Sequence, residues 1–397
     1  MQLREIHFNH DPGGATSDAF TLGRCPAFVR PGEPLTITAP EWKDGIAKPV
    51  AYARNLVTDP VTIKASFSRG PAGERVKIRA VGPVGDRLRV NGPARQTTFL
   101  GDVQSKFVVF DHEGNSGLQT FDLKSRIGKA PVGVTDVTWT WQYYHGGRAW
   151  HDFATTTTKV FVTIWLPVTP WKQAVAVAPD LLPWFEAIQL ACQWAAGATT
   201  NDDVIRNIAT AINGLPTLVY DEAGTQFVDT KKEEFLLTLF LSQLYWASSV
   251  TIDCRGIASA LMTFAGLLGV DLRPLVIEND LGGYMTTFDV KALSSPEWMP
   301  EKWTWHEVAV DPASPVLDNM GGVMPGVTIA ADQPLVDVMG RELIVYDANL
   351  HLNHDAPIFP IKVRLGTAGS GDQRYRDLLI QKGSGNRATP KNPRVAV

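Results

Sequence analysis

A cysteine at the start of an apolar segment is the residue in this sequence best placed to do chemistry. Residues 257–268, IASALMTFAGLL, are apolar almost throughout, which predicts a central helix packed on all its faces. Asp253 is a good N-cap for that helix, and Cys254 follows in its first turn. The helix dipole favours a thiolate there, so we expect the pKa of Cys254 to be depressed and the thiol to act as a nucleophile. The alternative is a buried structural cysteine.

A thiol nucleophile needs a general base within hydrogen-bond reach. Of the eight histidines, His306 differs from the rest because it stands near the beginning of a predicted strand, 303–310. The alternative is that His306 is an ordinary histidine on a sheet face. His351 and His354 form a weak metal-binding pattern, because no further ligand cluster accompanies them, and we expect no metal and no other cofactor.

The base in turn needs a carboxylate that orients its ring. Asp311 is near in sequence, but five strand residues put it about 16 Å from His306 and on the opposite face of the strand. Asp347 lies on the next predicted strand, 343–349, where it can stand beside His306. We therefore expect Asp347 to be the third member. The Gly- and Pro-rich stretch between these strands, 312–341, is predicted to be a long loop of a kind that is uncommon unless functional.

The elements that must position these residues indicate an α+β domain. Helical periodicity is present at 181–194, 204–213 and 233–247, ahead of the cysteine helix. Strands and loops are predicted after it. This domain is expected to span 171–382, with Cys192 as inert core, and the polar segment 383–397 is expected to be a disordered tail.

The first part of the chain has a different pattern. Residues 1–170 contain short runs that alternate apolar and polar side chains, such as 61–67 and 75–81, separated by Gly and Pro clusters. A long hairpin is predicted from 137–144 and 155–165, with its turn at Gly146-Gly147. These features predict a β-sandwich of immunoglobulin type, joined to the second domain by a linker near 166–175.

Composition limits the remaining possibilities. The chain has 397 residues, of which 44% are hydrophobic and 20% charged, and its net charge is −4, so nothing favours nucleic acid as a partner. Its three cysteines are too few for a disulfide framework. No signal-peptide pattern and no membrane span are predicted. We expect a cytoplasmic protein, or one exported without an N-terminal signal peptide, that acts on a peptide or protein substrate; the oligomeric state is left open.

The order of these elements resembles the transglutaminase-like family of papain-type cysteine enzymes. Three stretches carry the resemblance: a helix at 203–208 leading to Tyr220-Asp221, the helix from Asp253-Cys254 to Leu268-Gly269-Val270, and the strands WHEV at 305–308 and VYDA at 345–348. It covers roughly 175–360. Asp253-Cys254-Arg255-Gly256 also resembles the nucleophile motif of the NlpC/P60 cell-wall peptidases, but the WHEV strand favours the first family.

The resemblance implies a papain-like fold and a catalytic triad in which Cys254 is the nucleophile, His306 the base and Asp347 the orienting acid. One departure is the interval between His306 and Asp347, 41 residues, which is longer than the usual short hairpin of that family. The backbone N–H of Cys254 is expected to form part of the oxyanion hole. Gln243, Trp246 and Ser249 are candidates for its second donor, and Trp298, Trp303 and Trp305 for aromatic binding residues.

Two classes of function follow. The first is a cysteine hydrolase, a peptidase or amidase, that forms an acyl-enzyme at Cys254 and passes the acyl group to water; the same triad could instead pass it to an amine, as a protein-glutamine transglutaminase does. The second is a non-enzymatic binding or scaffold protein whose transglutaminase-like domain is catalytically silent. Hydrolysis is preferred, since water needs no second substrate site.

Overall fold

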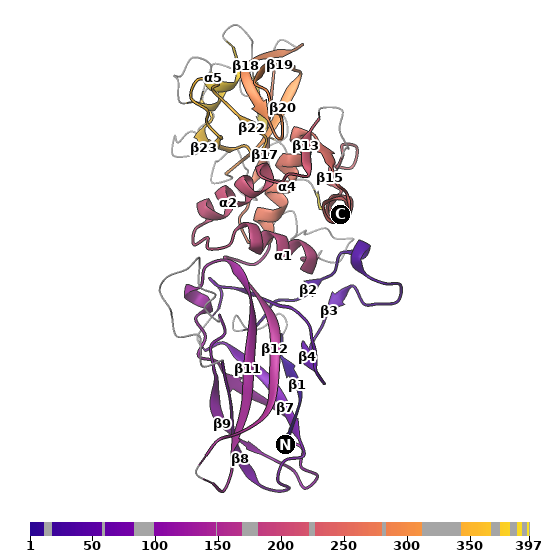
Figure 1. Cartoon of the computed structure of the whole chain (residues 1–397), viewed down its shortest axis with the longest axis vertical. Helices are drawn as coiled ribbons and strands as arrows, with labels where there is room; N and C mark the ends of the chain where they lie inside the picture. The colour runs from indigo at the N-terminus through magenta and orange to yellow at the C-terminus, as the bar shows by residue number, and fades with distance from the viewer. Residues whose placement is uncertain are drawn as a thin grey trace. The chain divides into compact units, whose positions relative to one another are not determined.

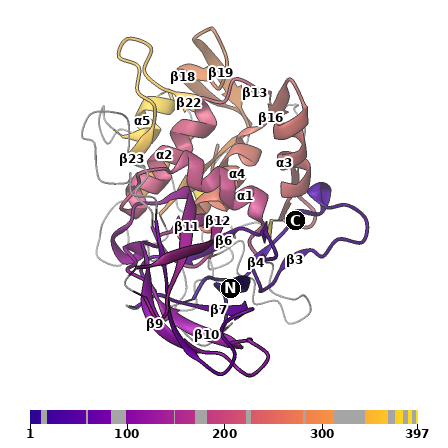
Figure 2. The same ribbon diagram turned by 60° about the horizontal axis from the view of Figure 1, so that its bottom comes forward.

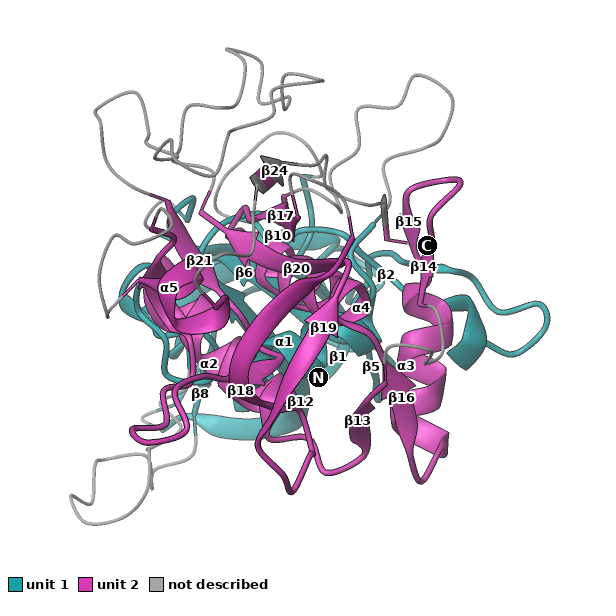
Figure 3. Cartoon of the chain, turned by 90° about the horizontal axis from the view of Figure 1, so that it is seen from above, with its two compact units in different colours: residues 1–166, 181–200 teal, residues 167–180, 201–397 magenta. Residues whose placement is uncertain are grey.

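The computed structural model describes residues 1–11, 18–57, 60–82, 99–147, 149–168, 182–221, 227–279, 283–311, 343–366, 374–381, 387–390 and 395–396. Two compact units divide the chain, one formed by 1–166 with 181–200 and the other by 167–180 with 201–397 (Figure 3). Among the described residues no helix is long and apolar enough to cross a membrane. The expected loop at 312–341 and most of the expected linker lie outside the described residues.

The first unit is built from two five-stranded sheets (Figure 1). One has the order β10-β7-β1-β4-β5, with β1 (Gln2–His7), β4 (Trp42–Lys43), β5 (Ile46–Ala47), β7 (Thr62–Ser68) and β10 (Leu118–Asp122). The other has the order β6-β12-β11-β8-β9, with β6 (Val50–Ala53), β8 (Arg75–Val81), β9 (Val103–Val109), β11 (Gly133–Tyr144) and β12 (His151–Thr163). Shorter elements are β2 (Leu22–Gly23), β3 (Thr36–Ile37) and the 3₁₀ turns Pro26–Phe28 and Ile127–Lys129.

Both sheets contribute to one hydrophobic core, as period-two patterning requires. Alternate residues of β7 and β8 are buried, and Trp139 and Trp141 of β11 lie fully inside with their rings edge to face. The predicted hairpin of β11 and β12 is present and antiparallel. One pairing is parallel, that of β6 with β12.

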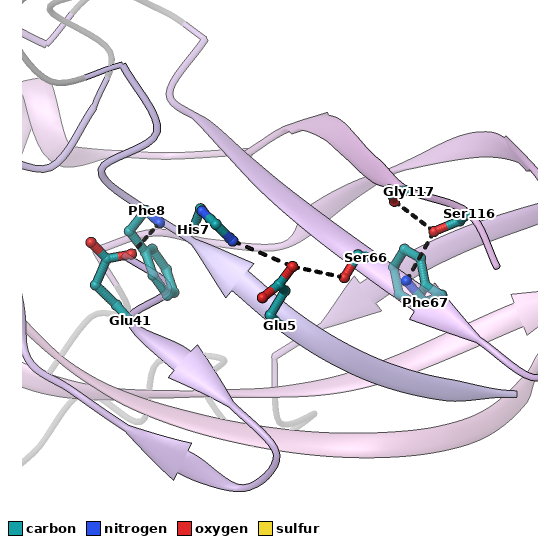
Figure 4. A network of polar contacts seen from close by, with 8 residues as sticks. All are labelled: Glu5, His7, Phe8, Glu41, Ser66, Phe67, Ser116 and Gly117. Carbon is teal, nitrogen blue, oxygen red and sulfur yellow. Dashed lines mark hydrogen bonds and ion pairs between the residues drawn. The ribbon is translucent and has the colours of Figure 1, made fainter. Parts of the chain in front are cut away.

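Two carboxylates of this unit, those of Glu5 and Glu41, have polar partners (Figure 4). The Glu5 carboxylate lies between His7 and Ser66, at 3.6 and 3.3 Å. Glu41 is buried, which raises its pKa, and its carboxylate accepts the Phe8 N–H at 2.8 Å. The hydrogen bond from Phe8 gives the buried Glu41 carboxylate a donor, as buried polar groups require.

Helix α1 (Phe185–Trp194) belongs to the first unit, although its sequence was assigned to the second domain. It packs against β11 and β12, where Cys192 Sγ lies 3.8 Å from the Val162 carbonyl. Burial raises the pKa of Cys192, in keeping with an inert core thiol. In the first turn of the helix, Glu186 accepts the backbone N–H of Cys25 at 2.8 Å.

The second unit combines helices with an antiparallel sheet of order β23-β21-β20-β17-β24 (Figures 1 and 2). Its strands are β17 (Arg273–Glu278), β20 (Trp305–Val310), β21 (Ile344–Tyr346), β23 (Ile361–Arg364) and β24 (Arg387–Pro390). The helices are α2 (Asn201–Asn213), α3 (Leu237–Trp246), α4 (Cys254–Leu267) and α5 (Tyr375–Leu379). Helix α4 packs on β17 and β20 and is flanked by α2. The chain is therefore an α+β protein.

Three smaller sheets complete this unit. They are β13-β16, β14-β15-β25 and β19-β18-β22, formed by β13 (Leu218–Tyr220), β14 (Val228–Asp229), β15 (Glu234–Phe235), β16 (Val250–Ile252), β18 (Met285–Ala292), β19 (Met299–Trp303), β22 (Leu350–His351) and β25 (Val395–Ala396). The expectation of a disordered tail at 383–397 is wrong for two segments: residues 387–390 pair with β17, and residues 395–396 pair with β15. The helix expected over 233–247 likewise begins only at Leu237, because 234–235 join a strand.

Candidate active site

Cys254 begins helix α4 shortly after β16, which pairs in parallel with β13. The Asp253 side chain accepts the Gly256 N–H at 2.7 Å, so the N-cap predicted from the sequence is present. Every residue of the helix except Arg255 is buried. Position 256 must be small, since a Cβ there would lie 2.7 Å from Ile252 Cγ1. The turn that presents the sulfur is thus fixed by the cap and by close packing against β16.

His306 lies on β20, the middle strand of the five-stranded sheet, and is fully buried. Its Nε2 is 3.1 Å from Oδ2 of Asp347, which directly follows β21. Trp303 stacks on the imidazole with ring centroids 5.0 Å apart. The other ring nitrogen, Nδ1, has no hydrogen-bond partner among the described residues. Because the carboxylate accepts at Nε2, the ring keeps its proton there and leaves Nδ1 as the basic atom.

The Asp347 carboxylate accepts three hydrogen bonds. Oδ1 accepts the backbone N–H of Asn349 at 2.7 Å, and Oδ2 accepts the phenol of Tyr375 at 2.7 Å in addition to the His306 contact. Asp311 occupies a different place, where its backbone N–H donates to the Ile344 carbonyl at 3.4 Å. Asp347 is therefore the carboxylate that the structure brings to His306.

The environment of the Cys254 thiol differs from the expected one. Cys254 is only 4% exposed, and burial raises the pKa of its thiol well above the ordinary value. The carboxylates of Asp253, Glu307 and Asp347 act in the same direction, and only a hydrogen bond from the Glu307 backbone opposes them. The predicted depression of the pKa is thus wrong, because desolvation and three negative charges outweigh the dipole of one helix.

Glu307 connects the thiol to an ion pair with the partly exposed Arg255. Its side chain is fully buried, and Oε2 lies 3.6 Å from Nε of Arg255, the residue after the cysteine. The Arg255 guanidinium also covers the ring of Trp305 at 4.3 Å from the ring centroid. This arrangement holds the start of α4 against β20 at the level of His306.

A cavity of about 150 Å³ lies beside the sulfur, lined by Tyr220, Asp253, Cys254, Trp303, Thr304 and Trp305. Two of the expected aromatic residues, Trp303 and Trp305, are among them, whereas Trp298 packs edge-on against His354. Gln243, Trp246 and Ser249, the candidates for the second oxyanion donor, are absent from the lining of this cavity, and Trp246 is 66% exposed. The expected source of that donor is therefore not supported.

The weak metal pattern resolves into other contacts. His351 Nε2 lies 3.2 Å from the Asn213 side-chain oxygen, and His354 is exposed beside Asp355. Within the described part of the chain, no group of three or more His, Cys, Asp or Glu residues is arranged to hold a metal ion.

No protein-family profile matches this sequence. No curated protein matches it either. Among solved structures, the crystal structure of red sea bream transglutaminase is similar over 83% of this chain and 61% of that chain, with 12% sequence identity and a TM-score of 0.33. This chain thus spans less than two thirds of the length of that transglutaminase. The likeness is distant.

Sequence reasoning missed Tyr375 and the pairing of Arg255 with Glu307. Tyr375 gave no signal, because a single tyrosine far along a region of strands and loops has no motif around it. Arg255 and Glu307 were visible as neighbours of Cys254 and His306, but their pairing depends on how α4 meets β20. The one available clue was that a cation, Arg255, follows Cys254 and an anion, Glu307, follows His306.

Proposed function

We propose that this protein is a cysteine-dependent acyl-transfer enzyme, a peptidase or amidase of transglutaminase-like type, in which Cys254, His306 and Asp347 form the triad. The observation that supports it is the buried contact between His306 and Asp347. The residue after His306, Glu307, forms a hydrogen bond to the Cys254 thiol through its backbone. A buried imidazole aligned by a carboxylate, on the strand that contacts the cysteine helix, supplies two parts of what nucleophilic catalysis needs. Nδ1 of His306 has no hydrogen bond to the sulfur in the described part of the chain, so it must move closer for proton transfer.

The raised pKa of the thiol defines how such an enzyme would work. The thiol keeps its proton at rest, and Nδ1 of His306 takes that proton as sulfur attacks the substrate carbonyl. The sulfur–carbon bond forms, the imidazolium returns its proton to the leaving amine, and water then cleaves the thioester. Asp347 stabilises the imidazolium that exists between these steps.

The same burial supports a second candidate, a binding or scaffold protein whose second unit is catalytically silent. A thiol that is 4% exposed and surrounded by carboxylates is a poor nucleophile until the base removes its proton. The two candidates differ in whether Cys254 ever carries an acyl group.

The test is hydrolysis of a peptide-amide library by the wild-type protein and by Cys254→Ala, with Cys192→Ala as the control for losing a buried thiol elsewhere. We expect Cys254→Ala to lower the rate by about 10⁴-fold or more while the protein stays folded, and Cys192→Ala to keep it. Adding a primary amine and measuring the mass of the product by mass spectrometry distinguishes hydrolysis from amine transfer. Equal rates for wild type and Cys254→Ala would favour the silent scaffold.

A further inference from the structure

We infer that Tyr375 is a positioning residue of this site: its phenol fixes the carboxylate of Asp347, which in turn holds the imidazole of His306. The inference rests on the proposed function and extends it by one residue. The geometry that points to it is a shared oxygen, since Oδ2 of Asp347 accepts the Tyr375 phenol at 2.7 Å and lies 3.1 Å from His306 Nε2.

Tyr375 is held from both ends. Its ring is fully buried in the hydrophobic cluster of the second unit, among residues of β17, β20 and β21. Its backbone begins α5, which is fastened by the Arg376 N–H donating to the Leu365 carbonyl at 3.0 Å. Farther along, the Gln381 side chain donates to the Thr287 carbonyl at 2.7 Å. The hydroxyl therefore reaches Asp347 from a fixed point.

The contact does more than satisfy a buried phenol. With Asn349 on Oδ1 and Tyr375 on Oδ2, both carboxylate oxygens are restrained, so the side chain cannot rotate away from His306. Hydrogen bonds to a carboxylate are short and strong, and 2.7 Å agrees with this.

The phenol serves only as a donor. Burial and the Asp347 charge raise the pKa of Tyr375 well above its ordinary value, so the hydroxyl keeps its proton wherever Asp347 is ionised. Tyr375 does not line the cavity beside Cys254, which is bounded by Tyr220, Trp303 and other residues. Removing the Tyr375 hydroxyl should therefore change the positioning of the His306 ring and leave substrate binding unchanged.

The experiment compares Tyr375→Phe with Tyr346→Phe, which removes another phenol from the same unit one residue before Asp347. The Tyr346 hydroxyl is directed to Asp202 at 3.5 Å and has no part in the site. We measure kcat and KM for amide hydrolysis, and the ¹⁵N signals of the His306 ring at a pH where the ring is neutral. The signals report the fraction of the ring protonated at Nε2.

Tyr375→Phe should lower kcat by about 10-fold to 100-fold with KM changed less than about twofold, and should lower the Nε2-protonated fraction. Tyr346→Phe should match wild type in both. A Tyr375→Phe protein with wild-type kcat and ring signals would overturn the inference. If wild-type protein hydrolyses no amide and yet its ring signals depend on Tyr375, the proposed function fails while the positioning role stands.

Discussion

Asp347 Oδ2 lies 3.1 Å from His306 Nε2, and both side chains are buried where β20 and β21 run side by side. The pairing register accounts for this contact. Ala309 pairs with Tyr346, so the chain that continues past Tyr346 runs back along β20 toward His306. Asp347 is the first residue of that continuation.

Asp347→Asn should lower kcat by about 10²-fold to 10⁴-fold, because the amide no longer stabilises the imidazolium or fixes its tautomer. The thiol itself should still react with iodoacetamide. Asp311→Asn is the matched control, since Asp311 lies on the neighbouring strand end and contacts Ile344 through its backbone. Steady-state kinetics of both variants check this, and equal losses from the two would contradict the assignment of Asp347.

The Cys254 thiol should ionise only at high pH. Burial raises its pKa, so its alkylation rate in the folded protein should keep rising with pH above neutrality instead of reaching a plateau below pH 7. Rates measured from pH 5 to 10 with mass mapping of Cys254 check this. A plateau at acidic pH would show that a thiolate–imidazolium pair exists at rest.

The same raised pKa predicts a loss of stability at high pH. Below about pH 8.5 the thiol is neutral in both the folded and the unfolded chain and its contribution is fully present. As pH rises further, the unfolded chain releases the proton before the folded one, so the free energy of unfolding falls. The fall should be smaller in Cys254→Ala, and urea unfolding of the two proteins from pH 7 to 10 measures the difference.

Asp253 has two effects that substitutions separate. Asp253→Asn keeps a good N-cap and removes a negative charge beside the sulfur, so it should lower the pKa of Cys254 and speed alkylation, by about tenfold for each pKa unit. Asp253→Ala also loses the cap and should cost about 1 kcal/mol. Alkylation rates and urea unfolding distinguish the effects; slower alkylation in Asp253→Asn would contradict this electrostatic account.

The buried Glu307 carboxylate should depend on Arg255. Arg255→Met leaves the Glu307 carboxylate without its cation and should destabilise the protein by about 1–3 kcal/mol. This is less than for a fully buried pair, because Arg255 is partly exposed to solvent. Adding Glu307→Gln should recover part of the loss. Arg206→Met removes the exposed Arg206–Asp203 pair and should change stability by less than about 1 kcal/mol. Denaturant unfolding gives all three values.

Local sequence rules predicted the parts of the site that depend on neighbours in the chain. The Asp253 cap and the helix after Cys254 follow from residue types alone, and strand parity was enough to prefer Asp347 to Asp311. The α+β class followed from the change of periodicity along the chain.

The rest depends on contacts between distant segments. The polar 383–397 region contains strands because β17 and β15 offer free edges, which no local pattern records. Tyr375 reaches Asp347 only through the packing of α5, and α1 packs on the sandwich rather than on the helices that follow it. The pKa of Cys254 was mispredicted chiefly because burial, the largest cause of its rise, depends on tertiary packing; the carboxylate of Asp253, its neighbour in the chain, and those of Glu307 and Asp347 add to it.

The most direct test of acyl transfer is the mass of the protein after brief exposure to p-nitrophenyl acetate, a small acyl donor, followed by mapping of the adduct. We expect one acetyl group on Cys254, released on standing in water, and none on Cys25 or Cys192, which are fully buried thiols in the same chain. His306→Ala should remain unlabelled at Cys254. A folded wild-type protein that acquires no acetyl group at Cys254, or that is acetylated equally with and without His306, would contradict the account.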